Sequence, residues 1–464
     1  MFAKIANTFT NCFRIPELKS RILFTLFVLA VCRLVSIITI PGLDGAALME
    51  YFRKLSTTQG GSGLLGMYSM FTGGALERCA IGSLGIMPYI SATIIIQLLT
   101  AVVPQLSKLA REEGGRPKLI QYGRYLTVLL CLGQGMVMAV GWENAREIFQ
   151  GFDGNLVQNP GWWYRIQTTL ILTTGTLLLM WMGEQITERG IGNGVSLVIT
   201  IGILARLPQA GQSLMDMFGS TGAMAERFNL FHSIALIILL LAVVAGTVAV
   251  TQAQRKVAVQ YAQRAVGRKV YQGGTSFMPL RVNYAGVMPI IFAQAILMFP
   301  QKILEFMAGI EGVSPGLKSL LRSVGAMLNH GEPVYFVVYG LMILFFSYFW
   351  VATQFNELQI ADDLKKYGGY IPGVRPGQAT SDFLHHSMSR ITLAGAVFLT
   401  IIAVIPDLLY KVMTVPYAVA TFFGGTSLLI TVGVMLDTMR QMETHLLMRH
   451  YDGFLKKGRM RGRF

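Results

Sequence analysis

The stretch Gly85-Ile86-Met87-Pro88-Tyr89-Ile90 decides the fold, because the chain repeats its pattern later as Gly286-Val287-Met288-Pro289-Ile290-Ile291. Glycine, methionine, proline and the final isoleucine fall at the same offsets, and both copies lie in long apolar segments. Proline within a spanning helix removes a backbone donor and bends the helix. Membranes tolerate such breaks where the freed carbonyl meets protein or water, so the breaks mark cavities. Two matched broken helices predict an internal repeat around a shared path, with two unrelated kinked packing helices as the alternative.

Composition places the chain in a membrane. It is 53% hydrophobic and only 14% charged, with a mean hydropathy of +0.52, which excludes an ordinary soluble domain. Windows without formal charge recur at lengths that suit a bilayer. We therefore predict an all-α polytopic membrane protein with ten transmembrane helices, in the windows 34–43 (extended back to 22 if Arg33 is tolerated), 79–107, 125–142, 166–183, 190–205, 228–254, 282–301, 333–356, 391–406 and 412–436.

The basic residues predict the orientation. If the N-terminus is cytoplasmic, 27 of the 39 lysines and arginines lie on the inner side and 11 on the outer side, with Arg33 inside the first span. The positive-inside rule then places both termini in the cytoplasm. The net charge of +15 mostly reflects this asymmetry, so by itself it is no sign of nucleic-acid binding.

Two features lie near the outer face. Arg33 invites a functional interpretation because it lies within a span; alternatively it snorkels to the outer interface or pairs with a neighbouring helix. The loop 43–77 carries glycines at 60, 61, 63 and 66 before the apolar run 67–71, which is too short to span. Such a segment suits a piece that folds back into the protein and can move out, or a peripheral loop resting on the surface. Farther along, residues 317–328 predict an amphipathic helix on the membrane surface.

Four cytoplasmic segments connect the predicted helices. Residues 108–124 mix acids and bases, which indicates a solvated turn, and 183–194 is a glycine-rich turn that joins two helices without a nucleotide-binding pattern. Residues 255–283 hold six basic residues and no acid, and 355–390 contain Arg375 between prolines and glycines that predict a turn with the guanidinium at its tip. Connections of this length suggest a docking surface for a partner. The simpler alternative is that their basic residues only set the membrane topology.

Nothing in the sequence indicates catalysis. None of the six histidines has metal-ligand spacing, and no Gly-x-Ser-x-Gly or nucleotide motif occurs. We expect no catalytic residues, no metal and no cofactor, and so no enzyme. The predicted spans also hold no Asp or Glu, whereas proton-coupled carriers usually carry an intramembrane acid.

Seven motifs together resemble the SecY family of bacterial protein-conducting channels: Gly73 to Leu76, Leu84 to Ala92, Gly183 to Gly194, Pro279 to Asn283, Ala285 to Pro289, Ile371 to Gly377 and Gly424 to Ile430. They extend over nearly the whole chain. The resemblance implies two inverted five-helix halves around a central hourglass pore. On that basis the predicted divisions are a cytoplasmic lead 1–20, halves 21–210 and 211–440, and a basic cytoplasmic tail 441–464.

The resemblance also implies roles for individual residues. The pore ring is Ile86, Ile90, Val195, Ile199, Ile291 and Ile430, where Val195 departs from the usual isoleucine and leaves the ring slightly wider. The plug covers about 61–74 and includes Leu64, Leu65, Met67, Met70 and Phe71. The lateral gate includes Ser91, Gln134, Asn283 and Phe299, and partner docking uses Arg255, Lys256 and Arg375. A collar of branched aliphatic side chains offers no groups to hydrate an ion, so an empty pore dewets there; without the resemblance, ordinary core packing would explain the same six residues.

The implied function is a channel that passes unfolded secretory polypeptides across the bacterial plasma (inner) membrane and releases transmembrane segments sideways into lipid. The implied partners are the small membrane subunits SecE and SecG, the SecA motor ATPase, the ribosome, signal peptides and nascent chains as substrates, and membrane lipids. A secondary transporter with inverted repeats and a small polar substrate is the alternative. The absent intramembrane acids and the large basic loops argue against it.

Overall fold

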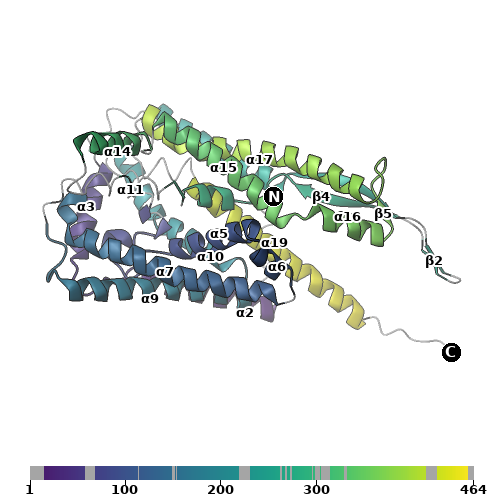
Figure 1. Ribbon diagram of the computed structural model, residues 1–464, viewed down its shortest axis with the longest axis horizontal. Helices are drawn as coiled ribbons and strands as arrows, with labels where there is room; N and C mark the ends of the chain where they lie inside the picture. Colours follow the sequence, from purple (N-terminus) through teal and green to yellow (C-terminus); the bar gives the residue numbers. More distant parts are fainter. Residues whose placement is uncertain are drawn as a thin grey trace. The chain divides into compact units, whose positions relative to one another are not determined.

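The computed structural model describes residues 15–57, 68–69, 71–112, 114–148, 152, 154–218, 230–261, 264–266, 269–271, 274–294, 296–297, 304, 314–328, 332–413 and 426–457 (Figure 1). Contacts divide the chain into two compact units. Unit 1 comprises Met1–Ala225, Pro416–Val419 and Ile430–Phe464, and unit 2 comprises Glu226–Val415 and Ala420–Leu429.

Unit 1 is helical. Its elements are α2 (Pro16–Val35), α3 (Gly45–Thr57), η1 (Leu76–Arg78), α5 (Met87–Val102), α6 (Pro104–Arg111), α7 (Gly115–Glu143), α8 (Ala145–Ile148), α9 (Trp162–Arg189), α10 (Gly194–Leu204) and α11 (Leu207–Phe218), together with most of α19 (Thr426–Lys457). Helix α7 packs against both α9 and α5, and α2 packs against α9 and α10. The long pair α7 and α9 lies side by side in Figure 1.

Helix α5 begins at Met87, so the prediction of a continuous helix from residue 79 is wrong at its start. The residues before Met87 form turns because their backbone groups bond the end of α2: Ile81 N–H donates to Ile38 O at 2.9 Å and Gly82 N–H to Val35 O at 3.1 Å. Pro88 occupies the first turn of α5, where its missing N–H has no intrahelical acceptor to lose. It therefore starts the helix and does not bend it.

The prediction of a solvated turn at 108–124 is also wrong, because nearly all of it is helix. Val103 is extended before Pro104, as the residue preceding a proline prefers, and α5 and α6 meet at a 105° bend. Gly114 then takes a left-handed φ of +83° and α7 begins at Gly115. The basic residues of this segment lie on α6 and α7, and Arg124 of α7 pairs with Glu184 of α9 through nitrogen–oxygen distances of 3.0 and 2.8 Å.

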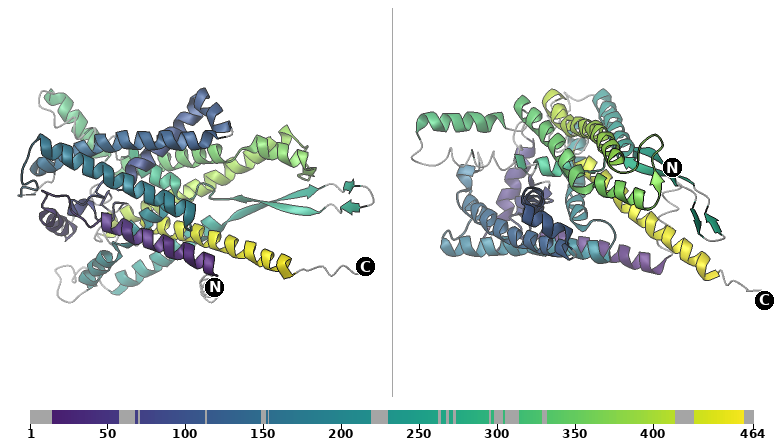
Figure 2. Two further views of the ribbon diagram at one scale, coloured as in Figure 1. Left: turned by 90° about the horizontal axis from the view of Figure 1, so that it is seen from below. Right: turned by 45° about the vertical axis from the view of Figure 1, so that its right-hand side comes forward.

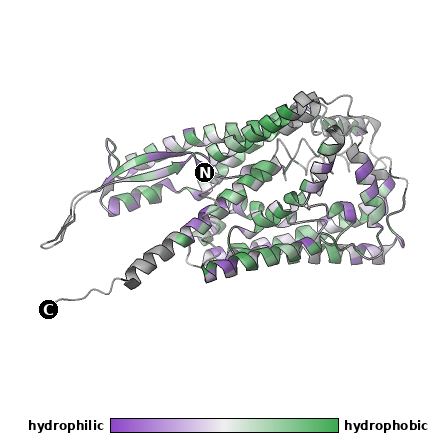
Figure 3. Ribbon diagram, turned by 180° about the vertical axis from the view of Figure 1, so that it is seen from behind, coloured by the Kyte–Doolittle hydropathy of each residue, from purple (hydrophilic) through white to green (hydrophobic). Residues whose placement is uncertain are grey.

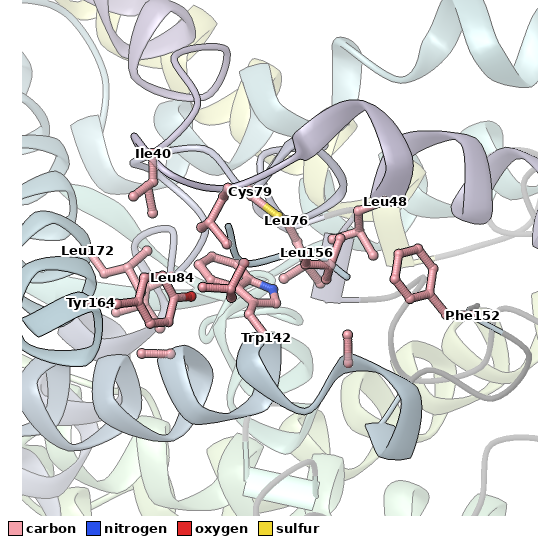
Figure 4. Close-up of a cluster of buried hydrophobic side chains, with 14 of the residues drawn as sticks. Ile40, Leu48, Leu76, Cys79, Leu84, Trp142, Phe152, Leu156, Tyr164 and Leu172 are labelled. Carbon is pink, nitrogen blue, oxygen red and sulfur yellow. The ribbon is translucent and has the colours of Figure 1, made fainter. Parts of the chain in front are cut away.

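A buried cluster joins the outer connections of unit 1 to the helices α7 and α9. Trp142, Leu172 and Tyr164 of these helices meet Ile40, Leu48 and Cys79 from the connecting segments (Figure 4). Trp142 is 2% exposed and Leu172 is fully buried. This cluster provides a rigid support for the turns that precede α5.

Unit 2 combines helices with a small sheet. Its elements are α12 (Leu230–Gln252), β1 (Gln254–Tyr261), β2 (Arg264–Val266), β3 (Lys269–Tyr271), β4 (Thr275–Arg281), α14 (Pro315–Met327), α15 (Pro333–Gln354), α16 (Glu357–Lys366), β5 (Gly369–Tyr370) and α17 (Gln378–Met413). Strand β1 pairs antiparallel with β4, from Gln254↔Arg281 to Gln260↔Thr275, and with β5 through Gln260↔Tyr370 and Tyr261↔Gly369. Strands β1 and β4 form the long ribbon seen in Figure 2.

The two long segments that were predicted to be cytoplasmic loops contain regular secondary structure. Residues 254–261 and 275–281 are the antiparallel strands β1 and β4, and 355–390 contain α16, β5 and the start of α17. The sheet packs on the helices through a buried cluster that includes Val257, Leu280, Phe355, Ile371 and Leu384. An apolar cluster of this size gives both segments one fixed conformation, which a solvated loop would lack.

Apolar faces without protein cover identify the membrane segments. Among the described residues, five helices are long and apolar enough to span a bilayer, or six if the bent pair α5–α6 is counted as one span. Their outward residues, such as Leu129 on α7, Ile238 on α12 and Leu341 on α15, are more than half exposed. The long helices are accordingly mainly green in Figure 3. The polytopic helical class is confirmed, and the count of ten spans stays a prediction.

Candidate functional site

The two copies of the repeated motif adopt the same backbone. Gly85 and Gly286 have left-handed φ angles of +60° and +63°, a conformation that costs glycine little and other residues more. In each copy the next residue accepts the first bond of a helical turn, from Ile90 N–H to Ile86 O at 3.2 Å and from Ile291 N–H to Val287 O at 3.4 Å. One copy lies in each unit. This shared geometry favours the internal repeat over two unrelated kinks.

The predicted ring residues are aliphatic side chains near helix starts. Ile86 and Ile90 lie at the start of α5, and Val195 and Ile199 lie in the first turns of α10. Ile430, in α19, is fully buried, and Ile86, Ile90 and Ile199 are at most 4% exposed. Val195 is half-buried. These five residues belong to unit 1, whereas the buried Ile291 belongs to unit 2.

Their burial fits a closed, dry constriction. None of the six side chains carries a polar atom, so none compensates an ion for its lost hydration shell. The branched aliphatic groups also form no directional bond that an entering polypeptide must break. The assembly of the six residues into one ring stays a prediction.

The predicted plug is only partly within the described residues. Leu64, Leu65, Met67 and Met70 lie outside them, and Phe71 is described and 8% exposed. Tyr68, also within the predicted plug, donates its hydroxyl to Leu84 O at 3.3 Å. The end of the outer loop thus contacts the turn that carries the first motif copy.

Arg33 binds this same segment. Its two terminal nitrogens each donate to Gly73 O at 3.2 Å. The acceptor is a backbone carbonyl and not a side chain of a neighbouring helix, and snorkelling to the outer interface stays a prediction. A carbonyl acceptor has no sequence signature, so sequence reasoning could find the arginine but not its partner.

Sequence reasoning missed a second polar contact of this segment. Arg206, in the turn between α10 and α11, contacts the hydroxyl of Ser69 and the carboxylate of Glu77. Ser69 also donates to Glu77 Oε1 at 2.8 Å. The partners lie more than a hundred residues apart in sequence, and the only available signal was opposite charge in two outer loops.

The prediction of a turn over 183–194 is wrong for residues 183–189, which belong to α9; the turn comprises only 190–193, joins α9 to α10 and also binds two other helices. Ile191 N–H donates to the Thr25 hydroxyl of α2 at 3.1 Å, and Gly192 N–H donates to Gln441 Oε1 of α19 at 2.8 Å. A Cβ on Gly194 would lie 1.8 Å from Gly183 O, so only glycine fits there. The turn therefore fixes both α2 and α19, the helix that carries Ile430.

The three predicted docking residues are exposed and belong to connected elements of unit 2. Arg255 and Lys256 are on β1, opposite Leu280 and Pro279 of β4. Arg375 follows β5, which is hydrogen-bonded to β1. Its carbonyl accepts from the Thr380 hydroxyl at 2.9 Å. The strand pair β1–β4 and the Arg375 turn are thus parts of one structure in unit 2.

The predicted gate residues lie on separate elements. Ser91 of α5 and Gln134 of α7 are half-buried on helices that pack together. Asn283 is 8% exposed, and its amide nitrogen has no partner among the described residues. Phe299 lies outside the described residues. The gate stays a prediction.

Metal binding has no support within the described ranges, where no group of three His, Cys, Asp or Glu side chains could hold an ion. The site is therefore built from aliphatic side chains, backbone turns and a few ion pairs. Such an arrangement suits a seal made by apolar packing.

Comparison with known proteins decides the family. The SecY family model matches residues 80–439. The chain belongs to the SecY family. The chain is 41% identical over 458 residues to the protein translocase subunit SecY of Thermotoga maritima, covering 98% of this chain and 99% of that protein. It is 42% identical over 449 residues to the SecY of Escherichia coli K12, with 96% of each chain covered.

Solved structures show the same fold. A protein-conducting channel has a TM-score of 0.58 at 18% identity, covering 95% of this chain and 94% of that chain. Sec61 in a canine ribosome–channel complex from the endoplasmic reticulum has a TM-score of 0.57, also at 18% identity. The SecY family is a family of translocation channels, so the chain is a multi-pass membrane protein and not an enzyme.

Proposed function

We propose that this SecY-family chain forms a protein-conducting channel for unfolded secretory polypeptides in the bacterial plasma membrane, with both termini in the cytoplasm. The observation that carries the proposal is the repeated motif, which gives one backbone geometry to both units and places buried aliphatic side chains at each copy. Its closed state is a dry aliphatic ring, and its open state admits an extended chain between those side chains.

The remaining elements take complementary roles. The outer-loop segment ending near Gly74 is the plug, and the seam between the two motif-bearing helices is the lateral gate that releases apolar segments into lipid. Hydrogen bonds across such a seam contribute only about 1 kcal/mol each, so the gate can reopen. SecE and SecG are the small subunits that surround the channel.

The cytoplasmic hairpin and the Arg375 turn form the docking surface for the SecA motor or the ribosome. Support comes from their exposed basic side chains, held in place by the buried cluster around Ile371 and Leu384. Charge complementarity of this kind increases association rate and fixes the register of the partner.

Reconstitution tests the proposal. The chain, co-purified with its small subunits in vesicles, is given SecA, ATP and a secretory precursor, and protection of the precursor from protease is measured. We expect protection that requires the motor and an intact signal sequence. Vesicles that take up a small solute without a motor, and protect no precursor, would contradict the proposal and favour a secondary transporter.

A further inference from the structure

A four-residue turn links two helices that carry predicted ring residues. Residues 190–193 lead from α9 into α10, which carries Val195 and Ile199. The same turn binds α19, which carries Ile430. Among the described residues, α10 packs along α9 and α2 but makes no comparable helix–helix contact with α19. The position of α19 relative to α10 therefore depends on this turn.

One hydrogen bond provides the polar part of the link. Gly192 is buried, and its N–H donates to Gln441 Oε1 at 2.8 Å. The left-handed φ of +92° at Gly192 and its lack of a Cβ allow α19 to approach closely, since an added Cβ would lie 3.0 Å from Thr438 Oγ1. A buried N–H that loses its acceptor costs more than an exposed one, so this bond favours one position of α19.

Apolar packing adds to the link. Ile191 is 3% exposed and forms a buried cluster with Leu18 of α2, against which Met442 and Leu446 of α19 pack. The N–H of Ile191 donates to the Thr25 hydroxyl of α2 at 3.1 Å. Two neighbouring N–H groups of one turn are thus bonded to two different helices, α2 and α19.

Helix α19 connects this junction to the ring without a break. Ile430 lies about three turns before Gln441, or about 16 Å along the helix axis. At this spacing the two side chains share one face of the helix, and Val434 and Thr438 lie on the same face. Ile430 is fully buried and Val434 is 4% exposed. A shift of α19 at Gln441 therefore moves Ile430, because a packed helix of this length moves as a rigid element.

We propose that the junction of Ile191 and Gly192 with Gln441 sets the separation of α10 and α19, and with it the width of the aliphatic ring. The proposal rests on the proposed function of that ring as the path of the polypeptide. Gln441 is a positioning residue: its side chain binds the turn, and it acts on the path through the ring residues of α10 and α19.

The test uses Gln441→Met, which keeps the length of the side chain and removes the acceptor. Gln441 is exposed, so the substitution leaves the core intact. The purified complex is given precursors that carry disulfide-closed loops of increasing size, and their protection from protease inside vesicles is measured together with resting conductance in planar bilayers. We expect larger loops to pass and conductance to rise about fivefold, the factor that corresponds to one net hydrogen bond of about 1 kcal/mol. Gln441→Glu keeps an acceptor oxygen and should behave like the unmodified chain.

Thr25→Val is the matched control, because it removes the acceptor of the neighbouring N–H in the same turn. Thr25 is 7% exposed, and its helix α2 carries none of the six predicted ring residues. We expect Thr25→Val to lower the thermal midpoint of the complex at least as much as Gln441→Met, and to leave conductance and the largest accepted loop unchanged. Equal changes in the two variants would overturn the proposal, because general loosening of the turn would then explain both.

A linear precursor separates the junction from the channel function. If the unmodified complex passes the linear precursor while Gln441→Met accepts no larger loop and conducts no more than the unmodified chain, the junction is overturned and the channel stands. If the unmodified complex passes no linear precursor, the proposed function fails, and the proposed role of the junction fails with it.

Discussion

A polar side chain in the ring should make the closed channel leak ions, and Ile90→Asn is the most direct case. Ile90 is 4% exposed, so the substitution removes an apolar side chain from a dry site, a loss of about 2 kcal/mol. The asparagine amide is satisfied only if water enters. The loss of about 2 kcal/mol of apolar burial applies to the dry state only. The ratio of wet to dry states should therefore rise about thirtyfold.

Planar bilayers containing the purified complex provide the assay, with conductance measured at rest and without a motor. The matched control is Leu172→Asn, because Leu172 of α9 is also buried but lies in the cluster with Trp142 of α7 (Figure 4). We expect Ile90→Asn to raise resting conductance strongly and Leu172→Asn to lower only thermal stability. Equal conductance in both variants would refute the reasoning, because burial alone would then explain the effect.

Three further predictions follow from the motif, the docking turn and the gate. Gly85→Ala should lower the thermal midpoint of the complex more than Gly286→Ala. Both substitutions cause left-handed backbone strain of about 1 kcal/mol. Of the two glycines, only Gly85 has a close neighbour, 3.1 Å from the added Cβ. Arg375→Glu should stop SecA-driven translocation while membrane insertion, measured by protease mapping, stays normal. Cysteines in place of Ser91 and Phe299 should form a disulfide that stops transport of a precursor until a reductant is added.

Each of these has a contradicting outcome. The close neighbour of Gly85 is Thr72, whose Cγ2 lies 3.1 Å from the added Cβ, and equal midpoints for the two glycine variants would show that this contact has no effect. Normal translocation by the Arg375→Glu variant would show that Arg375 only helps to set the membrane topology. Lys365→Glu on α16 is the control for a charge reversal nearby. A complete disulfide with unaffected transport would refute the lateral gate as drawn.

The sequence predicted the membrane class and the internal repeat because both depend on local patterns. Charge-free windows locate helices such as α12 and α15 within a few residues. The glycine of each motif copy marks a left-handed position that its chemistry alone favours. These features need no knowledge of distant contacts.

Features that depend on tertiary contacts were missed. The start of α5 was placed too early because bonds from Ile81 and Gly82 to the end of α2 hold the preceding residues in turns. The basic segment 255–283 looked like a loop, yet its alternate residues Val257 and Val259 are buried and the segment is a hairpin. The pair of Arg206 with Glu77 joins distant loops, and charge alone does not specify a partner.

Cross-linking of a stalled precursor tests the central claim most directly. A photoreactive residue is placed in turn at Ile86, Ile199, Ile291 and Ile430, and at the core position Leu172, in complexes holding a precursor halted midway. A polypeptide passing through the aliphatic ring should give adducts from all four ring positions and none from Leu172. Adducts absent from the ring, or equally frequent at Leu172, would contradict the path proposed here.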